Sequence, residues 1–376
     1  IQASLAAFLA RPGPAQHVET AQIILQRMVG EGGPAGVRVR AEAARVIGMS
    51  PDVFDRELRR LLEDDAVEVA REAIRAAGRL GKRTLVLRLI DRIAEPPLTD
   101  EVVASLASMG DRVVPALREY LASREGAPAL RRELPAVLQA IGTPPAQAVL
   151  VEHLLDADTT TRLRVVAALN KLVQLHPSRS FDRAIVETAL AAEITGHYRS
   201  YQVLATMGGA LDGAEPVEQA VRDSLVQESE RIFRLMKILY PAHDLHSAFV
   251  GVQSAEAAIR DNALEFLEQV LPPAMRALVV PLFDRAVSIE ARASAAERVV
   301  GVTVGSRDEA VEVLSLSRDP WLQSCAAYAI GELRLAHLAH LVDAWADDAD
   351  PLLRTTAVAA RDKLKAHAAA PTMDVG

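Results

Sequence analysis

A short pattern recurs along this chain at a nearly constant spacing, and it limits the possible folds more than any other feature. In the last third of the chain an anchor residue is followed four residues later by alanine, and the anchors are Ile259, Ala291, Leu322 and Leu353. They are 32, 31 and 31 residues apart. A fixed period of this length, with apolar residues at helical spacing in each unit, is typical of a solenoid of stacked helix pairs. The pattern therefore predicts an open repeat architecture.

Two copies near the N-terminus also carry a glycine nine residues after the anchor. They are Val39 with Ala43 and Gly48, and Val69 with Ala73 and Gly78. Gly331 has the same offset from Leu322, and because glycine accepts the left-handed conformation that ends many helices, we expect these glycines to be helix ends. The small alanine lets neighbouring helices approach closely. We therefore expect buried contacts between repeats at Ala263, Ala295, Ala326 and Ala357.

The composition favours helix over sheet. The chain has 376 residues, of which 50% are hydrophobic and only 4% aromatic, and it is rich in alanine, leucine, valine, arginine and glutamate. It is too long for one compact core, which fits an open repeat architecture. It has no run of about 18 apolar residues, so we expect no transmembrane helix. The predicted fold class is therefore all-α.

The segment DPWLQSCAAYAIG, which begins at Asp319, resembles the second helix of HEAT repeats, an armadillo-like family of α-solenoids. The segment DPLLRTTAVAA, which begins at Asp350, shares the Asp-Pro start but lacks the final glycine. The resemblance covers about residues 36–172 and 254–365. It implies an all-α HEAT-type solenoid of stacked antiparallel helix pairs.

The Asp-Pro dipeptides also predict where helices begin. Aspartate caps the free N–H groups of a first turn, and proline tolerates that turn. In HEAT repeats this aspartate and the arginine four residues later in the pattern often pair between successive repeats. Asp350 with Arg354 fits that rule, whereas Asp319 has Gln323 at the equivalent position, so the predicted Asp–Arg ladder is interrupted.

The period fails between about residues 177 and 253. SFDRAIVETALAAEITGHYRSYQVLATM and PVEQAVRDSLVQESERIFRLMKILYP each read as one long helix, with the glycine-rich MGGALDGAEP as the loop between them. We therefore predict three parts in one continuous solenoid: N-terminal HEAT-like repeats over 1–176, an irregular long-helix segment over 177–253, and C-terminal HEAT-like repeats over 254–376.

The stretch from Glu228 to Leu271 looks like the soluble C-terminal part of bacterial proteins that resemble ATP/ADP translocases. Those proteins join a transporter-like membrane domain to HEAT repeats, often followed by a cyclic-nucleotide-binding domain. The resemblance implies a cytoplasmic regulatory module placed beside a membrane domain. It implies no transport activity for this chain.

The irregular segment carries the most unusual polar and aromatic cluster of the sequence. GHYRSY combines histidine, arginine and two tyrosines, and Tyr and Arg are the residue types that anchor interfaces. We expect a protein-interaction surface made by six residues: His197, Tyr198, Arg199, Tyr201, Arg231 and Arg234. In the alternative interpretation the tyrosines pack between helices with their hydroxyl groups satisfied.

Other candidate chemistry is weakly supported, so we expect no catalytic residue, no metal and no cofactor. His243 with His246, and His337 with His340, have the spacing of a ligand pair on one helix face, but a zinc site needs three or four ligands. The loop GEGGPAG lacks the Lys-Ser/Thr of a phosphate-binding loop. The only cysteine, Cys325, lies inside a repeat helix, which indicates a buried structural thiol.

The leading hypothesis is a non-catalytic scaffold that binds a protein or a neighbouring domain. The alternatives are the regulatory module of a translocase-like protein, and an enzyme of the lyase or DNA glycosylase type on a HEAT-like scaffold. The net charge of −8 and the interspersed Arg and Glu argue against a nucleic-acid partner. A single cysteine fits a reducing compartment, so we expect a cytoplasmic location. The resemblance to translocase-like proteins implies the cytoplasmic face of a membrane protein as the alternative location.

Overall fold

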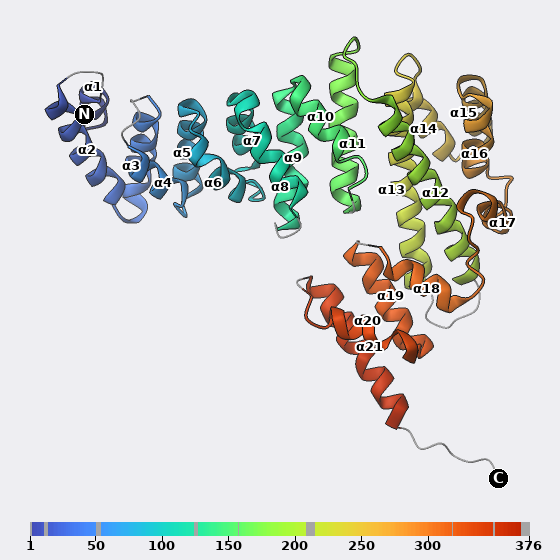
Figure 1. Ribbon diagram of the computed structural model, residues 1–376. Coiled ribbons are helices and arrows are strands. Elements are labelled where there is room, and N and C mark those ends of the chain that lie inside the picture. The colour runs from blue at the N-terminus through green and yellow to red at the C-terminus, as the bar shows by residue number, and fades with distance from the viewer. Residues whose placement is uncertain are drawn as a thin grey trace. The chain divides into compact units, whose positions relative to one another are not determined.

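The computed structural model describes residues 2–10, 14–49, 54–123, 127–156, 158–207, 215–317, 319–348 and 350–369. Within these ranges the secondary structure consists of 21 α-helices and three short 3-10 helices, with no strand (Figure 1). The predicted all-α fold class is therefore confirmed. The predicted loop MGGALDGAEP lies mostly outside the described residues.

The chain folds as two compact units. Unit 1 comprises residues 1–153 and 167–181, and unit 2 comprises residues 154–166 and 182–376. The irregular segment therefore belongs to the same unit as the helices that follow it. The predicted division into three parts of one continuous solenoid stays a prediction.

Unit 1 is a series of helix pairs joined by short connections. Its helices are α1 (Gln2–Leu9), α2 (Ala15–Gly30), α3 (Gly33–Ile47), α4 (Asp55–Leu62), α5 (Val67–Leu80), η1 (Arg83–Leu85), α6 (Val86–Asp91), α7 (Thr99–Ser108), η2 (Gly110–Arg112), α8 (Val114–Ala122), α9 (Pro128–Ile141), α10 (Pro144–Glu152) and the end of α11 (Thr159–Leu175).

The pairs of unit 1 stack in chain order. The longer helices α3, α5, α7 and α9 pack each on the next, and the shorter α4, α6, α8 and α10 each pack on a long helix (Figure 1). Each pair thus buries its apolar face against its neighbours, which is how a solenoid forms a continuous core. Ala43 and Ala73 are fully buried at these contacts, as the repeat pattern predicted.

The glycines at the +9 position have a different role from the one predicted. Gly48 has a φ of −65°, and Gly78 and Gly331 lie inside helices, so none of the three is a left-handed helix end. A Cβ atom on Gly78 would lie 2.8 Å from the Cβ of Ser105 on the next long helix. These glycines therefore allow the backbones of successive repeats to approach closely. Gly142 does have the expected left-handed conformation, with a φ of 69° at the end of α9.

Unit 2 begins with the start of α11 and contains the two long helices predicted from the sequence. Its further helices are α12 (Arg183–Met207), α13 (Glu215–Leu239), α14 (Leu245–Gln253), α15 (Ala257–Val270), α16 (Pro273–Phe283), α17 (Ile289–Val300), α18 (Arg307–Ser315), α19 (Pro320–Leu333), η3 (Ala336–Leu338), α20 (Ala339–Trp345) and α21 (Pro351–Ala369). Both α12 and α13 have 25 residues, and α12 packs against α13 and α17.

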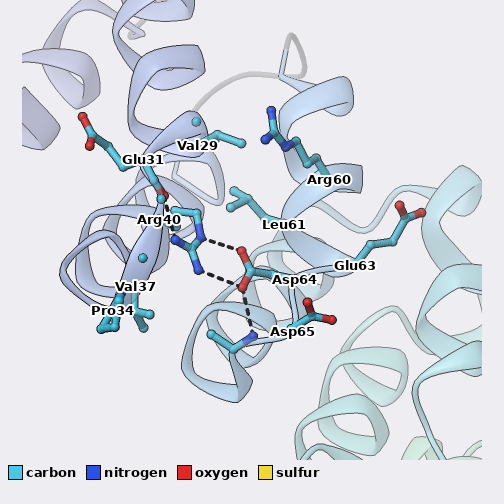
Figure 2. Close-up of a pocket in the computed structure, with 14 residues that line it drawn as sticks. Val29, Glu31, Pro34, Val37, Arg40, Arg60, Leu61, Glu63, Asp64 and Asp65 are labelled. Atoms are coloured by element: carbon cyan, nitrogen blue, oxygen red, sulfur yellow. Dashed lines mark hydrogen bonds and ion pairs between the residues drawn. The ribbon is translucent and has the colours of Figure 1, made fainter.

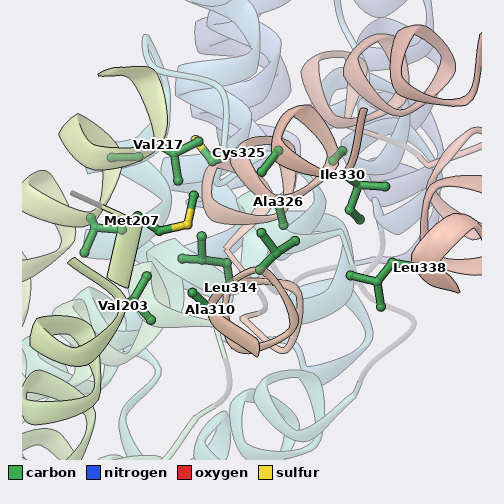
Figure 3. Close-up of a cluster of buried hydrophobic side chains, with 14 of the residues drawn as sticks. Val203, Met207, Val217, Ala310, Leu314, Cys325, Ala326, Ile330 and Leu338 are labelled. Atoms are coloured by element: carbon green, nitrogen blue, oxygen red, sulfur yellow. The ribbon is translucent and has the colours of Figure 1, made fainter. Parts of the chain in front are cut away.

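The C-terminal repeats of unit 2 pack onto the ends of the long helices. Figure 3 shows Met207 of α12, Val217 of α13 and Cys325 of α19 in one buried cluster. Cys325 is only 3% exposed, and burial together with the nearby Asp319 carboxylate raises its pKa to about 12. The thiol is therefore a packing group, as its position in the repeat indicated.

The predicted alanine contacts hold at three of four positions. Ala263, Ala326 and Ala357 are buried, whereas Ala295 is only half-buried and its neighbour Ala296 is fully buried. In α17 the fully buried alanine is thus one residue later than the pattern predicted. The residue four positions before it, which corresponds to the anchor of the other repeats, is Arg292, and Arg292 is itself buried.

The Asp-Pro starts are confirmed as helix caps. The Asp319 carboxylate accepts a hydrogen bond of 2.9 Å from the N–H of Trp321, and the Asp350 carboxylate accepts one of 2.9 Å from the N–H of Leu352. Arg354 donates to the main-chain carbonyl of Asp348 at 2.5 Å, and its predicted pairing with an aspartate stays a prediction.

Candidate functional site

The polar segment of α12 is mostly inside unit 2. His197, Tyr198 and Arg231 are at most 2% exposed, and Tyr201 is half-buried. The residues come from α12 and α13, whose helical spacing aligns their polar groups along one shared seam. The candidate site is therefore a buried polar network and not an open surface.

One end of this network is a carboxylate between two arginines. Glu193 of α12 accepts a hydrogen bond from Nε of Arg231 at 2.9 Å through Oε2, and its Oε1 lies 2.7 Å from Nε of Arg162 in α11. Burial lowers the pKa of Arg162, against the opposing effect of Glu193. A buried charge is tolerated only when it is paired in this way. Glu193 therefore joins three helices.

The other end is a histidine–carboxylate pair. Nδ1 of His197 lies 2.9 Å from Oε2 of Glu228 in α13. The hydroxyl groups of Ser200 and Ser224 donate to Oε1 of Glu228 at 2.9 Å and 3.0 Å. Burial opposes ionisation of Glu228, but the hydrogen bond and charge of His197, together with Arg231, hold the pKa of that carboxyl below its usual value. Glu228 is therefore a carboxylate whose oxygens are both satisfied.

The two tyrosines of the cluster bind the main chain of α16. The hydroxyl of Tyr198 donates to the carbonyl of Leu278 at 2.9 Å, and that of Tyr201 donates to the carbonyl of Leu282 at 3.3 Å. Burial raises the pKa of both phenols, so they remain protonated donors. The carbonyl of Leu282 is one of the last four of α16, which have no partner within the helix, and the Tyr201 hydroxyl supplies one.

Arg292 of α17 completes this contact. Its Nε donates to the carbonyl of Pro281 at 2.9 Å, and a second guanidinium nitrogen donates to the carbonyl of Asp284. The guanidinium carbon lies 4.8 Å from the centre of the Tyr201 ring. A cation at the C-terminal end of α16 is also favourable for the helix dipole. The cluster thus fixes α16 and α17 onto α12.

The structure separates the six predicted surface residues into two groups. His197, Tyr198 and Arg231 are buried and Tyr201 is held between helices, because their polar groups are needed inside unit 2. The predicted surface is therefore wrong for these side chains, and the alternative interpretation describes the tyrosines. Arg199 is exposed, and Arg234 forms a surface ion pair with Glu230 at 2.6 Å. An interaction surface stays a prediction for these two arginines only.

The sequence analysis missed the carboxylates that balance this network. Glu193 is four residues before His197, and Glu228 is three residues before Arg231, so each pair shares a helix face. That spacing was visible in the sequence. The contribution of Arg162 was not, because it depends on the tertiary packing of α11.

The four histidines that were considered as ligands lie at the surface. His337 is 3.7 Å from the carboxylate of Asp308, and the ring of His340 is 3.2 Å from the carbonyl of His337. Among the residues that the structure describes, no group of three or more His, Cys, Asp or Glu side chains is arranged to hold a metal ion.

A surface pocket of about 780 Å³ lies in unit 1, between the glycine-rich loop before α3 and the loop before α5. Figure 2 shows Arg40 between these two loops. Its Nε and one Nη donate to the carboxylate of Asp64 at 2.6 Å and 3.1 Å, and its other Nη donates to the carbonyl of Glu31 at 2.7 Å. Although burial opposes it, the hydrogen bond from Arg40 holds the pKa of Asp64 below its usual value. Arg40 and Asp64 thus form the kind of Asp–Arg pair between successive repeats that the HEAT resemblance implies.

Comparisons with known proteins show no family. No protein-family model and no curated protein matches the chain. Among solved structures, an engineered protein is similar with 15% identity and a TM-score of 0.28, over 97% of this chain and 99% of that chain. Human deoxyhypusine hydroxylase in complex with glycerol is similar with 15% identity and a TM-score of 0.19, over 97% of this chain and 96% of that chain. At these scores the similarities carry no functional conclusion. The resemblance to translocase-like proteins stays a prediction.

None of the described helices combines the length and the apolar character that crossing a membrane requires.

Proposed function

We propose that this protein is a non-catalytic helical-repeat scaffold that binds a protein partner or a neighbouring domain. One observation supports it most directly. Trp321 of α19 is 44% exposed and Leu352 of α21 is 48% exposed, although both are large apolar side chains. Each is the second residue of its helix, directly after the aspartate and proline that start it.

These two side chains belong to helices of unit 2 that pack against each other. Lys363 of α21 forms an ion pair with Glu332 of α19, and a Cβ atom on Gly331 would lie 2.9 Å from Cα of Ala360. The C-terminal halves of both helices are thus in contact. Trp321 and Leu352 hold equivalent positions at the starts of these two helices. We infer that their side chains form a short apolar row along the stack.

Such a row is suited to anchoring a partner. Tryptophan is among the residues that contribute most to binding energy at interfaces, and exposed apolar patches mark interaction sites more often than chance. Successive repeats that present equivalent side chains can bind an extended or helical segment along the stack. In this proposal the buried network of α12 and α13 keeps the repeats rigid and does not contact the partner. The proposal includes a cytoplasmic location, in keeping with the single reduced cysteine.

The test is affinity capture from the source cell with the double variant Trp321→Ser, Leu352→Ser. We expect one or more proteins to be retained by the unchanged chain and lost with the double variant. The matched control is Leu87→Ser, because Leu87 is 59% exposed in α6 of unit 1. Retention of the same proteins by all three chains, with circular dichroism showing intact folds, would contradict the proposed surface.

A further inference from the structure

A second pocket of unit 1 is lined mainly by arginine. It has a volume of about 420 Å³ and is formed by α4, the residue that follows it, and α6. The lining residues are Asp55, Arg56, Arg59, Arg60, Glu63 and Arg88. The chain as a whole has a net charge of −8, so this local excess of cations stands out.

The two acidic residues of this pocket are already neutralised by other cations. Asp55 forms an ion pair with Lys82, and Glu63 forms one with Arg88. Arg56, Arg59 and Arg60 form no ion pair or hydrogen bond with any carboxylate in the described ranges of the chain. Arg60 also faces the Asp64 carboxylate, whose pKa its charge helps to lower. The pocket therefore presents two guanidinium groups, those of Arg56 and Arg59, that no carboxylate compensates.

The positions of these arginines on α4 make the excess of positive charge unfavourable for the stability of the helix. Arg59 and Arg60 are three and four residues after Arg56, so both are neighbours of Arg56 on the helix surface, and like charges at this spacing destabilise a helix. In addition, Nε of Arg59 is buried and has no hydrogen-bond partner among the described residues. A buried donor without a partner is unfavourable. A bound anion would relieve both effects.

We propose that this pocket binds the dianionic phosphoryl group of a phosphate monoester, either on a small molecule or on a phosphorylated side chain of a protein. The planar guanidinium fork matches the geometry of phosphate oxygens, and several arginines together favour a doubly charged group over a single carboxylate. The pocket is in unit 1 and shares no residue with the Trp321 and Leu352 row. The proposal therefore does not depend on the proposed function.

The first experiment titrates phenyl phosphate into the full chain by isothermal calorimetry at constant ionic strength. We expect saturable binding that is weakened about tenfold or more by Arg59→Gln and by Arg56→Gln, because each removes a charged hydrogen-bond donor. Arg56 is exposed, so its variant keeps the test valid if the loss of Arg59 disturbs folding. The control is Arg27→Gln, an exposed arginine of α2 outside the pocket, which should bind like the unchanged chain. No saturable binding, or an equal loss with the Arg27 variant, would overturn the proposal.

Two further experiments identify the ionisation state of the phosphoryl group and the kind of compound that carries it. The second ionisation of a phosphate monoester has a pKa of about 6, so binding should weaken as the pH falls from about 7.5 to about 5. A phosphoserine peptide that binds more tightly than phenyl phosphate, while its unphosphorylated form does not bind, would indicate a protein-borne group. Equal affinity would indicate a small molecule. Tighter binding of a single-stranded oligonucleotide without a terminal phosphate would show a phosphodiester site and would refute the monoester assignment.

Discussion

At the scale of single residues, the unusual feature of this protein is a set of buried charges that satisfy one another. Glu193 neutralises Arg162 and Arg231, while Glu228 accepts hydrogen bonds from His197 and two serines. Buried ion pairs add little net stability compared with apolar residues, but removing one partner is costly because the other charge stays buried. The network therefore specifies how α11, α12 and α13 fit together.

We expect Glu193→Gln to lower the free energy of unfolding by about 3–5 kcal/mol, because it leaves the buried Arg231 and the partly buried Arg162 without their carboxylate. The control is Glu230→Gln in the surface pair with Arg234, which should change stability by only about 0–1 kcal/mol. Urea unfolding followed by tryptophan fluorescence measures both values. If the two substitutions lower the free energy of unfolding by the same amount, the buried network does not hold unit 2 together.

The sequence predicted the site only in part, and the reason is visible in individual residues. The sequence shows that His197, Tyr198 and Tyr201 cluster on one helix. Their burial was not evident, because it depends on the carbonyl groups of Leu278 and Leu282, which are some 80 residues away and have no side-chain signature. Polar and aromatic residues that anchor an interface in one protein can equally satisfy helix ends in another.

At the scale of helices, close approach depends on glycine and alanine. Gly331 lies against the backbone of Ala360, and Gly78 lies against Ser105. By contrast, Gly196 in α12 has no atom within 4 Å of the place where a Cβ would lie. The chain therefore contains glycines that packing requires and others, such as Gly196, that packing does not.

This contrast gives a matched pair of substitutions. Gly331→Ala should destabilise unit 2 by about 1–3 kcal/mol, because the added methyl group meets the backbone of α21, which must move. Gly196→Ala should stabilise the protein by about 0.4–1 kcal/mol, because alanine restricts the unfolded chain and has free space in the helix. Urea unfolding of both variants provides the comparison. Effects of the same sign would contradict the packing described for α19 and α21.

The helices that were predicted followed from sequence patterns that act locally. Asp319 and Asp350 cap their helices as expected, and the long helices α12 and α13 lie where the period fails. The misassigned alanine in α17 has a tertiary cause. The buried guanidinium of Arg292 occupies the position that an apolar anchor fills in the other repeats, and a sequence pattern counts arginine as a surface residue.

At the scale of the whole molecule, the chain consists of two units with different internal architecture. Unit 1 is a regular stack of helix pairs, whereas unit 2 is built around two long helices and a polar seam. Both tryptophans, Trp321 and Trp345, belong to unit 2, and unit 1 has none. Tryptophan fluorescence therefore reports on unit 2 alone, while circular dichroism reports on both units.

We expect urea unfolding of the full chain to give different midpoints with these two probes. Repeat arrays and proteins with several units often unfold in more than one step, because each unit has its own core. Glu193→Gln should also lower the urea midpoint of the fluorescence transition. The part of the circular dichroism transition that comes from unit 1 should keep its midpoint. Coincident transitions for both probes, before and after that substitution, would show a single cooperative unit instead.

The buried thiol of Cys325 has a consequence for oxidative damage. Because burial raises its pKa to about 12, the thiol is almost entirely protonated at pH 7, and the ionised form is the one that oxidants attack. In the folded protein this thiol is therefore protected from mild oxidation, and it becomes reactive only when the core around α19 opens. Since each chain has a single cysteine, an opened chain can be cross-linked to one other chain and no more. Oxidation of partly unfolded protein would thus yield covalent dimers and would not build the larger disulfide-linked aggregates that chains with several cysteines form.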